Sequence, residues 1–114
     1  MIKVEYAERG KKLSLQVEGH AGYAEHGNDI VCASASILAY TLAQIVRDVD
    51  RFGNLAFPTV VQMDSGDAFI SCEAYDDADL AVLKSMFTFA IRGYALLAHN
   101  YPQYVELTTV GEDI

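Results

Sequence analysis

Hydrophobic and polar residues alternate along four short stretches of the chain, which is the pattern of β-strands with one buried face. These stretches are residues 2–6, 13–17, 59–64 and 68–75. The turn sequences Arg9-Gly10-Lys11-Lys12 and Ser65-Gly66-Asp67 each join two of them, so two hairpins are expected. Val105 and Leu107 indicate a short closing strand near the end of the chain.

Two longer segments repeat their apolar residues at steps of three and four, the spacing of a helix with one buried face. The first begins after Asp29, a good N-cap, and runs to about residue 52, with Gly53 as a natural stop. The second begins near residue 76 or 77 and runs to about residue 100, because Pro102 stops it. The apolar stripe expected on the first helix consists of Val31, Ala35, Leu38, Leu42, Ile45, Val49 and Phe52.

This order of elements, strand-strand-helix-strand-strand-helix, predicts an α+β fold. We expect a two-layer sandwich, with a largely antiparallel sheet of four to five strands and both helices on one face. The chain has 114 residues, of which 52% are hydrophobic. That is enough for a core in one domain, residues 1–114.

The second helix carries more apolar surface than packing on one sheet requires. One stripe consists of Leu80, Leu83, Phe87, Ala90, Tyr94 and Leu97. A second stripe consists of Val82, Met86, Phe89 and Leu96. Two interpretations are open: a wide core face between the two helices, or the interface of a homodimer.

The composition of the chain limits which kinds of partner and which cellular compartment we expect. The net charge of −8 argues against nucleic acid, which needs a basic surface, and favours a basic peptide as partner. The sequence shows neither an apolar run near the roughly 20 residues that span a bilayer nor a signal peptide at its start. We therefore expect a cytoplasmic protein without membrane contact, where Cys32 and Cys72 would stay reduced.

Residues 19–32 carry the strongest chemical signal, because a histidine and a cysteine flank a loop with two glycines. With Asp29 as N-cap, Cys32 falls at the third helical position, where unpaired N–H groups and the helix dipole favour a thiolate. His20 is expected at the end of the second strand, on its polar face, as general base and acid. His26 competes for this role, but its place in the loop positions it less well. A buried, inert Cys32 and a surface His20 are the non-catalytic reading of the same residues.

Other residues of this block have supporting roles. Asp29 caps the helix and can orient the histidine, although its charge opposes a thiolate. Ser36 lies one turn after Cys32 and can form a hydrogen bond near the sulfur or with a backbone carbonyl. The N–H groups at the start of the helix are the expected donors to an oxyanion.

Alternative chemistries fit the sequence less well. Cys72 shares a strand face with apolar residues and is predicted to lie in the core, and the chain contains no C-x-x-C, P-loop or GxGxxG motif. No arginine follows Cys32 at the spacing of a phosphatase loop. A zinc site formed by His20, His26, Asp29 and Cys32 would match no compact zinc pattern, so neither metal nor cofactor is expected.

The segments Gly19-His20-Ala21 and Asp29-Ile30-Val31-Cys32-Ala33, followed by Ser36, resemble the ribosomal-processing cysteine protease family, Prp. The likeness extends over nearly the whole chain, as far as Tyr101-Pro102-Gln103-Tyr104-Val105. The resemblance implies that His20 and Cys32 are the catalytic pair, with Gly19, Asp29 and Ser36 as motif residues around it. It also implies a homodimer and a flexible loop over the active site.

The sequence therefore predicts a cysteine endopeptidase with a Cys-His dyad. By the resemblance, its substrate is a ribosomal protein precursor, from which it removes the N-terminal extension of large-subunit ribosomal protein twenty-seven during ribosome assembly. In the expected reaction, residues 21–28 close over an extended peptide and bring His20 to Cys32. The alternative is a non-catalytic acidic dimer that binds a partner peptide at its sheet edge.

Overall fold

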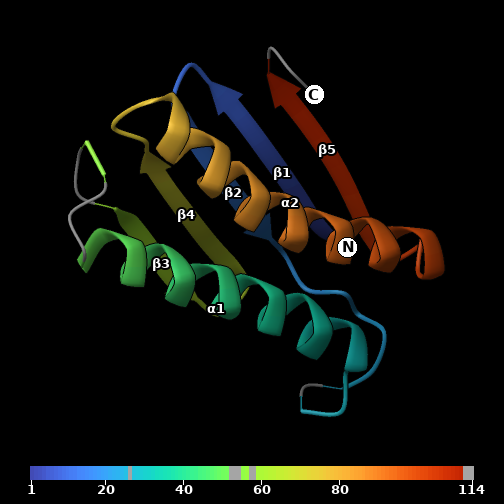
Figure 1. The fold of residues 1–114 in the computed structure, drawn as a ribbon. Coiled ribbons are helices and arrows are strands. Elements are labelled where there is room, and N and C mark those ends of the chain that lie inside the picture. Colours follow the sequence, from blue (N-terminus) through green and yellow to red (C-terminus); the bar gives the residue numbers. More distant parts are fainter. Residues whose placement is uncertain (26, 52–54, 57–58, 112–114) are drawn as a thin grey trace.

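The computed structural model describes residues 1–25, 27–51, 55–56 and 59–111. Within them the chain forms one five-stranded sheet and two helices (Figure 1). In chain order the elements are β1 (Ile2–Arg9), β2 (Lys12–Glu18), α1 (Ile30–Arg51), β3 (Val60–Asp64), β4 (Asp67–Glu73), α2 (Asp77–Asn100) and β5 (Val105–Gly111).

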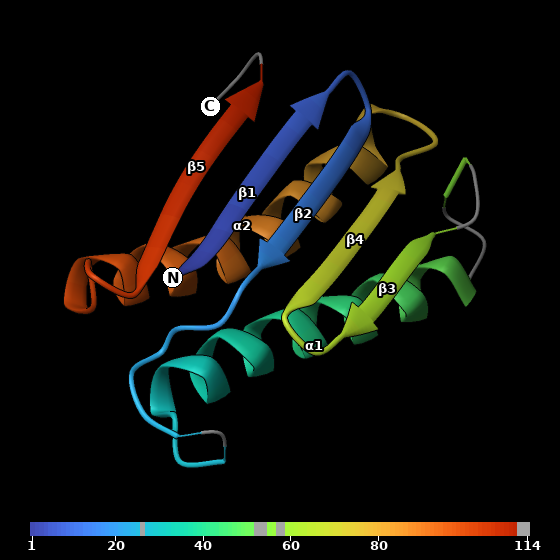
Figure 2. The ribbon, with the colours of Figure 1, turned by 180° about the vertical axis from the view of Figure 1, so that it is seen from behind.

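The sheet has the strand order β3-β4-β2-β1-β5 (Figure 2). β1 pairs with β2, β2 with β4, and β3 with β4, all antiparallel, so both predicted hairpins are present. β5 pairs with β1 in parallel and makes the sheet mixed. The closing strand is longer than predicted, because its pairing with β1 extends to Gly111 opposite Glu8.

Both helices cover the same face of the sheet, as the two opposite views show (Figures 1 and 2). The α+β, two-layer prediction is therefore confirmed. The core consists of alternate strand residues packed against the buried stripes of the helices. Its largest fully buried side chains are Tyr94, Phe87, Leu13, Leu15, Leu42, Ile70, Leu83, Val4, Val31, Val46 and Val105.

α1 begins after the predicted N-cap Asp29, and α2 begins where the second helix was predicted to start, with Asp76 as its N-cap. The Asp29 carboxylate accepts hydrogen bonds from N–H groups in the first turn of α1, and the Asp76 carboxylate accepts one from the Asp79 N–H at the start of α2. α2 ends at Asn100, as predicted. The described part of α1 ends at Arg51, and the stop predicted at residues 52 and 53 lies outside the described residues.

The buried stripe of α1 differs in part from the prediction. Its fully buried side chains are Val31, Ala35, Ala39, Leu42, Ala43 and Val46. The predicted Leu38, Ile45 and Val49 are only partly buried. Because three alanines lie at the centre of its buried face, α1 packs closely against the core, and the larger side chains lie at the margin of this contact.

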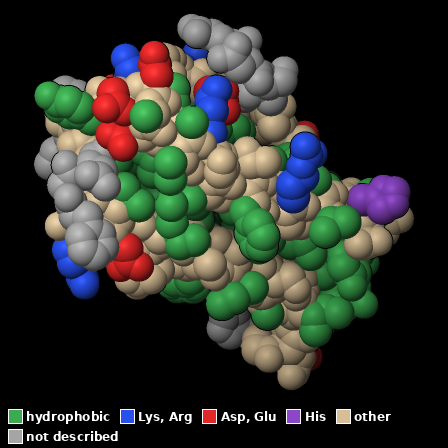
Figure 3. Space-filling model, in the orientation of Figure 1, with side chains coloured by type: hydrophobic (Ala, Val, Ile, Leu, Met, Phe, Trp, Pro, Cys, Tyr) green, Lys and Arg blue, Asp and Glu red, His purple; other side chains and the backbone are tan. Residues whose placement is uncertain are grey.

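The second apolar stripe of α2 is mostly exposed in the described part of the chain, and only Met86 is partly buried against the core. Val82, Phe89 and Leu96 are exposed, and hydrophobic side chains gather over the helical face of the molecule (Figure 3). Both helices are long and apolar enough, by length and composition, to cross a membrane. Each nevertheless packs its buried residues into the core of this fold, and core helices pass the same test of length and composition.

Candidate active site

Cys32 lies at the third position of α1, as predicted from the Asp29 N-cap. Its side chain is partly exposed, unlike that of Cys72, which is buried. The Cys32 sulfur accepts a hydrogen bond from the backbone N–H of Ala21, with 3.3 Å between nitrogen and sulfur. A backbone N–H is therefore directed at this sulfur, which lies at the start of a helix.

Asp29 connects the helix to the loop that precedes it. Its Oδ1 accepts hydrogen bonds from the N–H groups of Val31 (3.0 Å) and Cys32 (2.9 Å). Its Oδ2 accepts hydrogen bonds from the N–H groups of Tyr23 (3.0 Å) and Ala24 (3.2 Å). The buried Asp29 carboxylate therefore binds both the start of α1, which carries Cys32, and the loop that precedes this helix.

These donors decide the charge of the carboxyl group. Desolvation by burial raises the pKa of Asp29, but the hydrogen bonds from the Cys32, Ala24 and Tyr23 N–H groups, together with the Cys32 side chain, lower it. The net pKa lies below the usual value for an aspartic acid, so Asp29 is ionised at neutral pH.

His20 does not lie on the strand, which is where the sequence pattern placed it. β2 ends at Glu18, and His20 follows Gly19, whose φ of +91° turns the chain away from the sheet. A Cβ on Gly19 would collide with the backbone carbonyl of Met1. The Gly19 N–H donates a hydrogen bond to the carbonyl of Gly66 over 2.8 Å. This loop residue is therefore anchored to the β3–β4 turn, and that contact holds the exposed His20 next to the same turn.

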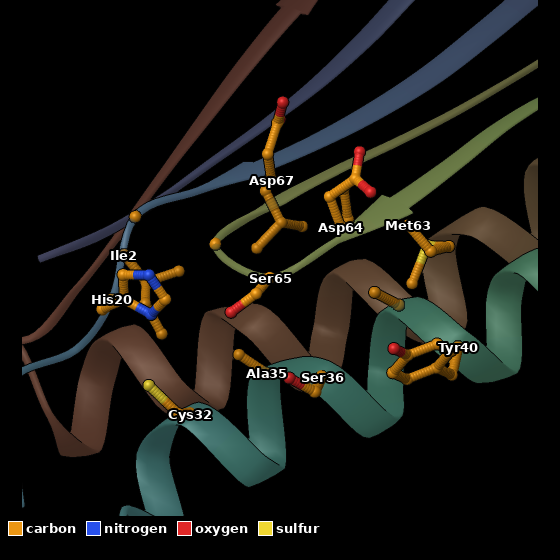
Figure 4. A pocket seen from close by; sticks show the side chains of 15 residues that line it. Ile2, His20, Cys32, Ala35, Ser36, Tyr40, Met63, Asp64, Ser65 and Asp67 are labelled. Atoms are coloured by element: carbon orange, nitrogen blue, oxygen red, sulfur yellow. The ribbon is translucent and has the colours of Figure 1, made fainter. Parts of the chain in front are cut away.

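His20 and Cys32 line the same two pockets. The first, of about 260 Å³, lies between α1 and the β3–β4 turn. Figure 4 shows Cys32, Ser36 and Tyr40 in succession along α1, with His20 and Ser65 on the opposite side of this pocket. The second, of about 510 Å³, extends under the loop beside Asp29. The described residues show no hydrogen bond between the His20 imidazole and the Cys32 thiol.

The supporting residues lie around this pair. Gly19 lines the first pocket, Asp29 lines the second, and Ser36 is exposed and lines both. The competing His26 lies outside the described residues. The described residues contain no group of three or more His, Cys, Asp or Glu side chains arranged to hold a metal ion; this finding does not cover His26.

Cys72 lies in the core, as predicted, with 3% of its surface exposed. Burial raises the pKa of its thiol to about 12. A thiol of this kind is inert near neutral pH, so Cys32 is the only cysteine that can supply a reactive sulfur.

α2 holds the beginning of α1 in place from behind the pocket. The buried Tyr94 hydroxyl donates a hydrogen bond to the carbonyl of Ala35 over 2.8 Å. Ala35 follows Cys32 by less than one turn and lines the first pocket. α2 therefore supports the position of α1, although no α2 residue lines either pocket.

Sequence reasoning missed several parts of the site. Tyr40 lies two helical turns after Cys32, so the spacing of Cys32, Ser36 and Tyr40 along one helix face was an available signal. Ser65 and Gly66 were assigned only to a turn, because no local pattern shows that this turn meets His20. The Ala21 N–H is a backbone group and carries no side-chain signal at all.

Comparison with known proteins shows which family and which fold this chain resembles. The family model described as "Cysteine protease Prp" matches residues 1–106. No curated protein matches the chain significantly by sequence. The ribosomal processing protease Prp from S. aureus, in a structure with a covalently linked product peptide, has a TM-score of 0.74 at 19% identity and covers 96% of this chain and 99% of its own. SMU.848 from Streptococcus mutans has a TM-score of 0.66 at 24% identity and covers 98% of this chain and 96% of its own.

The fold and the family match define an enzyme class: this is a cysteine protease. The chain belongs to the Prp family. A second S. aureus Prp structure, in complex with a substrate peptide, has a TM-score of 0.67 at 17% identity and covers 96% of this chain and 99% of its own. At these identities, the structural similarities establish the fold.

Proposed function

We propose that this protease uses Cys32 as nucleophile and His20 as general base and acid to cleave a ribosomal protein precursor. The observation that carries the proposal is that both side chains line the same two pockets, with a backbone N–H directed at the sulfur. The similarity to a ribosomal processing protease supports the substrate class. Within that class we propose the N-terminal extension of large-subunit ribosomal protein twenty-seven.

The proposed reaction passes through an acyl-enzyme. His20 takes the thiol proton, and the Cys32 thiolate attacks the carbonyl carbon of the scissile bond, whose π electron pair moves to the oxygen. As the carbonyl re-forms, the C–N bond breaks and the His20 imidazolium protonates the leaving amine. Water, deprotonated by His20, then attacks the thioester, and the C–S bond breaks to return the thiolate. The loop of residues 21–28 brings His20 and Cys32 together over the substrate.

The first pocket supports an uncharged side chain next to the scissile bond. Tyr40 and Met63 line it together with the hydroxyl residues Ser36 and Ser65. Asp64 and Asp67 also line it, and their carboxylates point away from α1 (Figure 4). We propose that an apolar substrate residue enters this pocket, while basic residues nearby are attracted by the negative protein.

The assembly and the location complete the proposal. The exposed stripe of Val82, Phe89 and Leu96 would be covered in a homodimer, since patches of this kind mark interfaces. A protease that acts on newly made ribosomal proteins would work in the cytoplasm, and its acidic surface makes nucleic acid an unsuitable partner.

The test uses purified protein and ribosomal precursors with their N-terminal extensions intact. Mass spectrometry of the products identifies the cleaved bond. We expect cleavage of the precursor of protein twenty-seven, loss of cleavage in Cys32→Ala, and normal cleavage in Cys72→Ala that has been shown to be folded. Unchanged cleavage by Cys32→Ala would remove Cys32 from the mechanism. If only a different precursor is cleaved, that precursor is the substrate and the proposal of protein twenty-seven is wrong.

A further inference from the structure

A tetrahedral intermediate at Cys32 needs a hydrogen-bond donor for its oxyanion, and three N–H groups at the start of α1 already have acceptors. The N–H groups of Val31 and Cys32 both donate to Asp29 Oδ1. The N–H of Ala33 donates to the Asp29 carbonyl over 3.0 Å. These three N–H groups are occupied by Asp29, so they are not free donors in this structure.

A different backbone N–H is directed at the reacting atom. The Ala21 N–H donates to the Cys32 sulfur over 3.3 Å, and Ala21 itself is 4% exposed. The carbon attacked by the sulfur becomes bonded to it, so the oxygen of that carbon forms beside the sulfur. An effective oxyanion donor lies about 2.7–3.1 Å from that oxygen. A small shift of the N–H from sulfur to oxygen meets this requirement.

Asp29 explains why the Ala21 N–H has this direction. Its Oδ2 holds the loop at the N–H groups of Tyr23 and Ala24, while its Oδ1 holds the helix that carries Cys32. The loop and the helix that carries Cys32 therefore hydrogen-bond to the same carboxylate. This shared carboxylate sets the direction of the Ala21 N–H relative to the sulfur.

We propose that the Ala21 N–H is the oxyanion donor of this enzyme and that Asp29 is the residue that positions it. The inference rests on the proposed nucleophile Cys32. Once His20 has taken the thiol proton, the Ala21 N–H stabilises the thiolate. When the S–C bond forms, negative charge leaves the sulfur and appears on the carbonyl oxygen, and the same N–H then donates to that oxygen. When the acyl-enzyme forms, the electron pair on this oxygen re-forms the carbonyl π bond and the bond from the carbon to the leaving group breaks.

Two small probes separate the two roles of this N–H. p-Nitrophenyl acetate acylates the sulfur through an oxyanion, whereas iodoacetamide alkylates it by displacement and forms none. The test protein carries a backbone ester at Ala21, in which an ester oxygen replaces the N–H and the methyl side chain is kept. In this protein we expect the rate of Cys32 acylation to fall by a factor at least about ten times larger than the factor by which the rate of alkylation falls. Both rates are measured at a pH where the sulfur is fully ionised.

A matched control tests whether any ester in the loop has this effect. The Asn28 N–H donates to the carbonyl of Glu25 over 2.9 Å, so an ester at Asn28 removes a loop hydrogen bond that does not involve the sulfur. We expect the ratio of acylation to alkylation to be unchanged there. If the ester at Ala21 slows both probes equally, or neither, the oxyanion assignment is wrong, while a Cys32-dependent protease activity would still stand. If Cys32→Ala reacts with both probes like the unmodified protein, the proposed nucleophile itself fails.

Asp29→Ser tests the positioning role. A serine still caps the helix, but its single oxygen cannot also hold the loop. We expect the ratio of acylation to alkylation to fall in this variant while circular dichroism and the unfolding midpoint stay near those of the unmodified protein. A variant that keeps the normal ratio would show that Asp29 only caps the helix.

Discussion

The imidazole of His20 packs against Gly66, so closely that a Cβ built on Gly66 would lie 2.5 Å from Nε2. Gly66 is in the β3–β4 turn with a φ of +74°, and its carbonyl accepts the hydrogen bond from Gly19. The turn thus contacts the histidine from the side opposite α1, where Cys32 lies (Figure 4). The absence of a side chain at Gly66 leaves the space that the ring occupies.

Gly66→Ala should therefore reduce activity more than stability. The new methyl group displaces the His20 ring, and we expect turnover to fall by about 10²-fold, the scale of losing general acid–base catalysis. The positive φ costs about 1–2 kcal/mol for a residue with a side chain. Peptide turnover and denaturant unfolding measure the two effects.

Gly10→Ala is the matched control for this variant. Gly10 also has a positive φ, +60°, but a Cβ there would meet no atom within 4 Å. It should lose similar stability and keep its turnover. Equal activity in the two variants would show that the contact with Gly66 does not position His20.

The two cysteines should differ sharply in reactivity. Burial raises the pKa of Cys72 to about 12, whereas the Cys32 sulfur is partly exposed and accepts a backbone N–H. At pH 7 we expect iodoacetamide to modify Cys32 alone in the folded protein, and both residues after unfolding. Peptide mapping by mass spectrometry reads out each site. Slow, equal modification of both would favour the peptide-binding module over the protease.

Loss of the Asp29 carboxylate should destabilise the protein in a pH-dependent way. Asp29→Ala removes the helix cap, which costs about 0.5–2 kcal/mol near neutral pH. Because the folded-state pKa of Asp29 is lowered, its stabilisation is complete above the unfolded value of about 3.9 and is lost as pH falls through the lower folded value. The difference in unfolding free energy between the two proteins should therefore shrink below about pH 4. A difference independent of pH would contradict the charged cap.

The exposed stripe on α2 gives a test of the proposed homodimer. Phe89 is 81% exposed, and Phe89→Ser should shift the protein to a monomer in analytical ultracentrifugation, because an interface loses its largest apolar side chain. Tyr75, 73% exposed and outside this stripe, provides the control Tyr75→Ser, which should leave the assembly unchanged. An unmodified protein that is monomeric at micromolar concentration would end the dimer proposal.

Much of this fold follows from local pattern. The alternation of residues 13–17 and 68–75 predicted strands, and Asp29 and Asp76 marked the helix starts, because each of these signals depends on neighbours in the chain. The parallel pairing of β5 with β1 did not follow, since it joins Ile2 to Val105 and depends on the packing of the whole sheet.

The site was predictable in its side chains and not in its backbone. The placement of Cys32 at the helix start needed only the Asp29 cap. The place of His20 depended on Gly19, whose left-handed conformation ended the strand earlier than the alternating pattern indicated. The hydrogen bond from the Ala21 N–H to the sulfur depends on the backbone conformation after Gly19, and the residue types alone do not show where that N–H points.

The most direct test of the central claim is to capture the acyl-enzyme. The protein is mixed with the unprocessed precursor of large-subunit ribosomal protein twenty-seven, quenched with acid during turnover and digested for tandem mass spectrometry. We predict a thioester between the new carboxyl end of the cleaved extension and the sulfur of Cys32, and its absence in Cys32→Ala. Cleavage that proceeds with the acyl group on another residue, or undiminished in Cys32→Ala, would contradict the account.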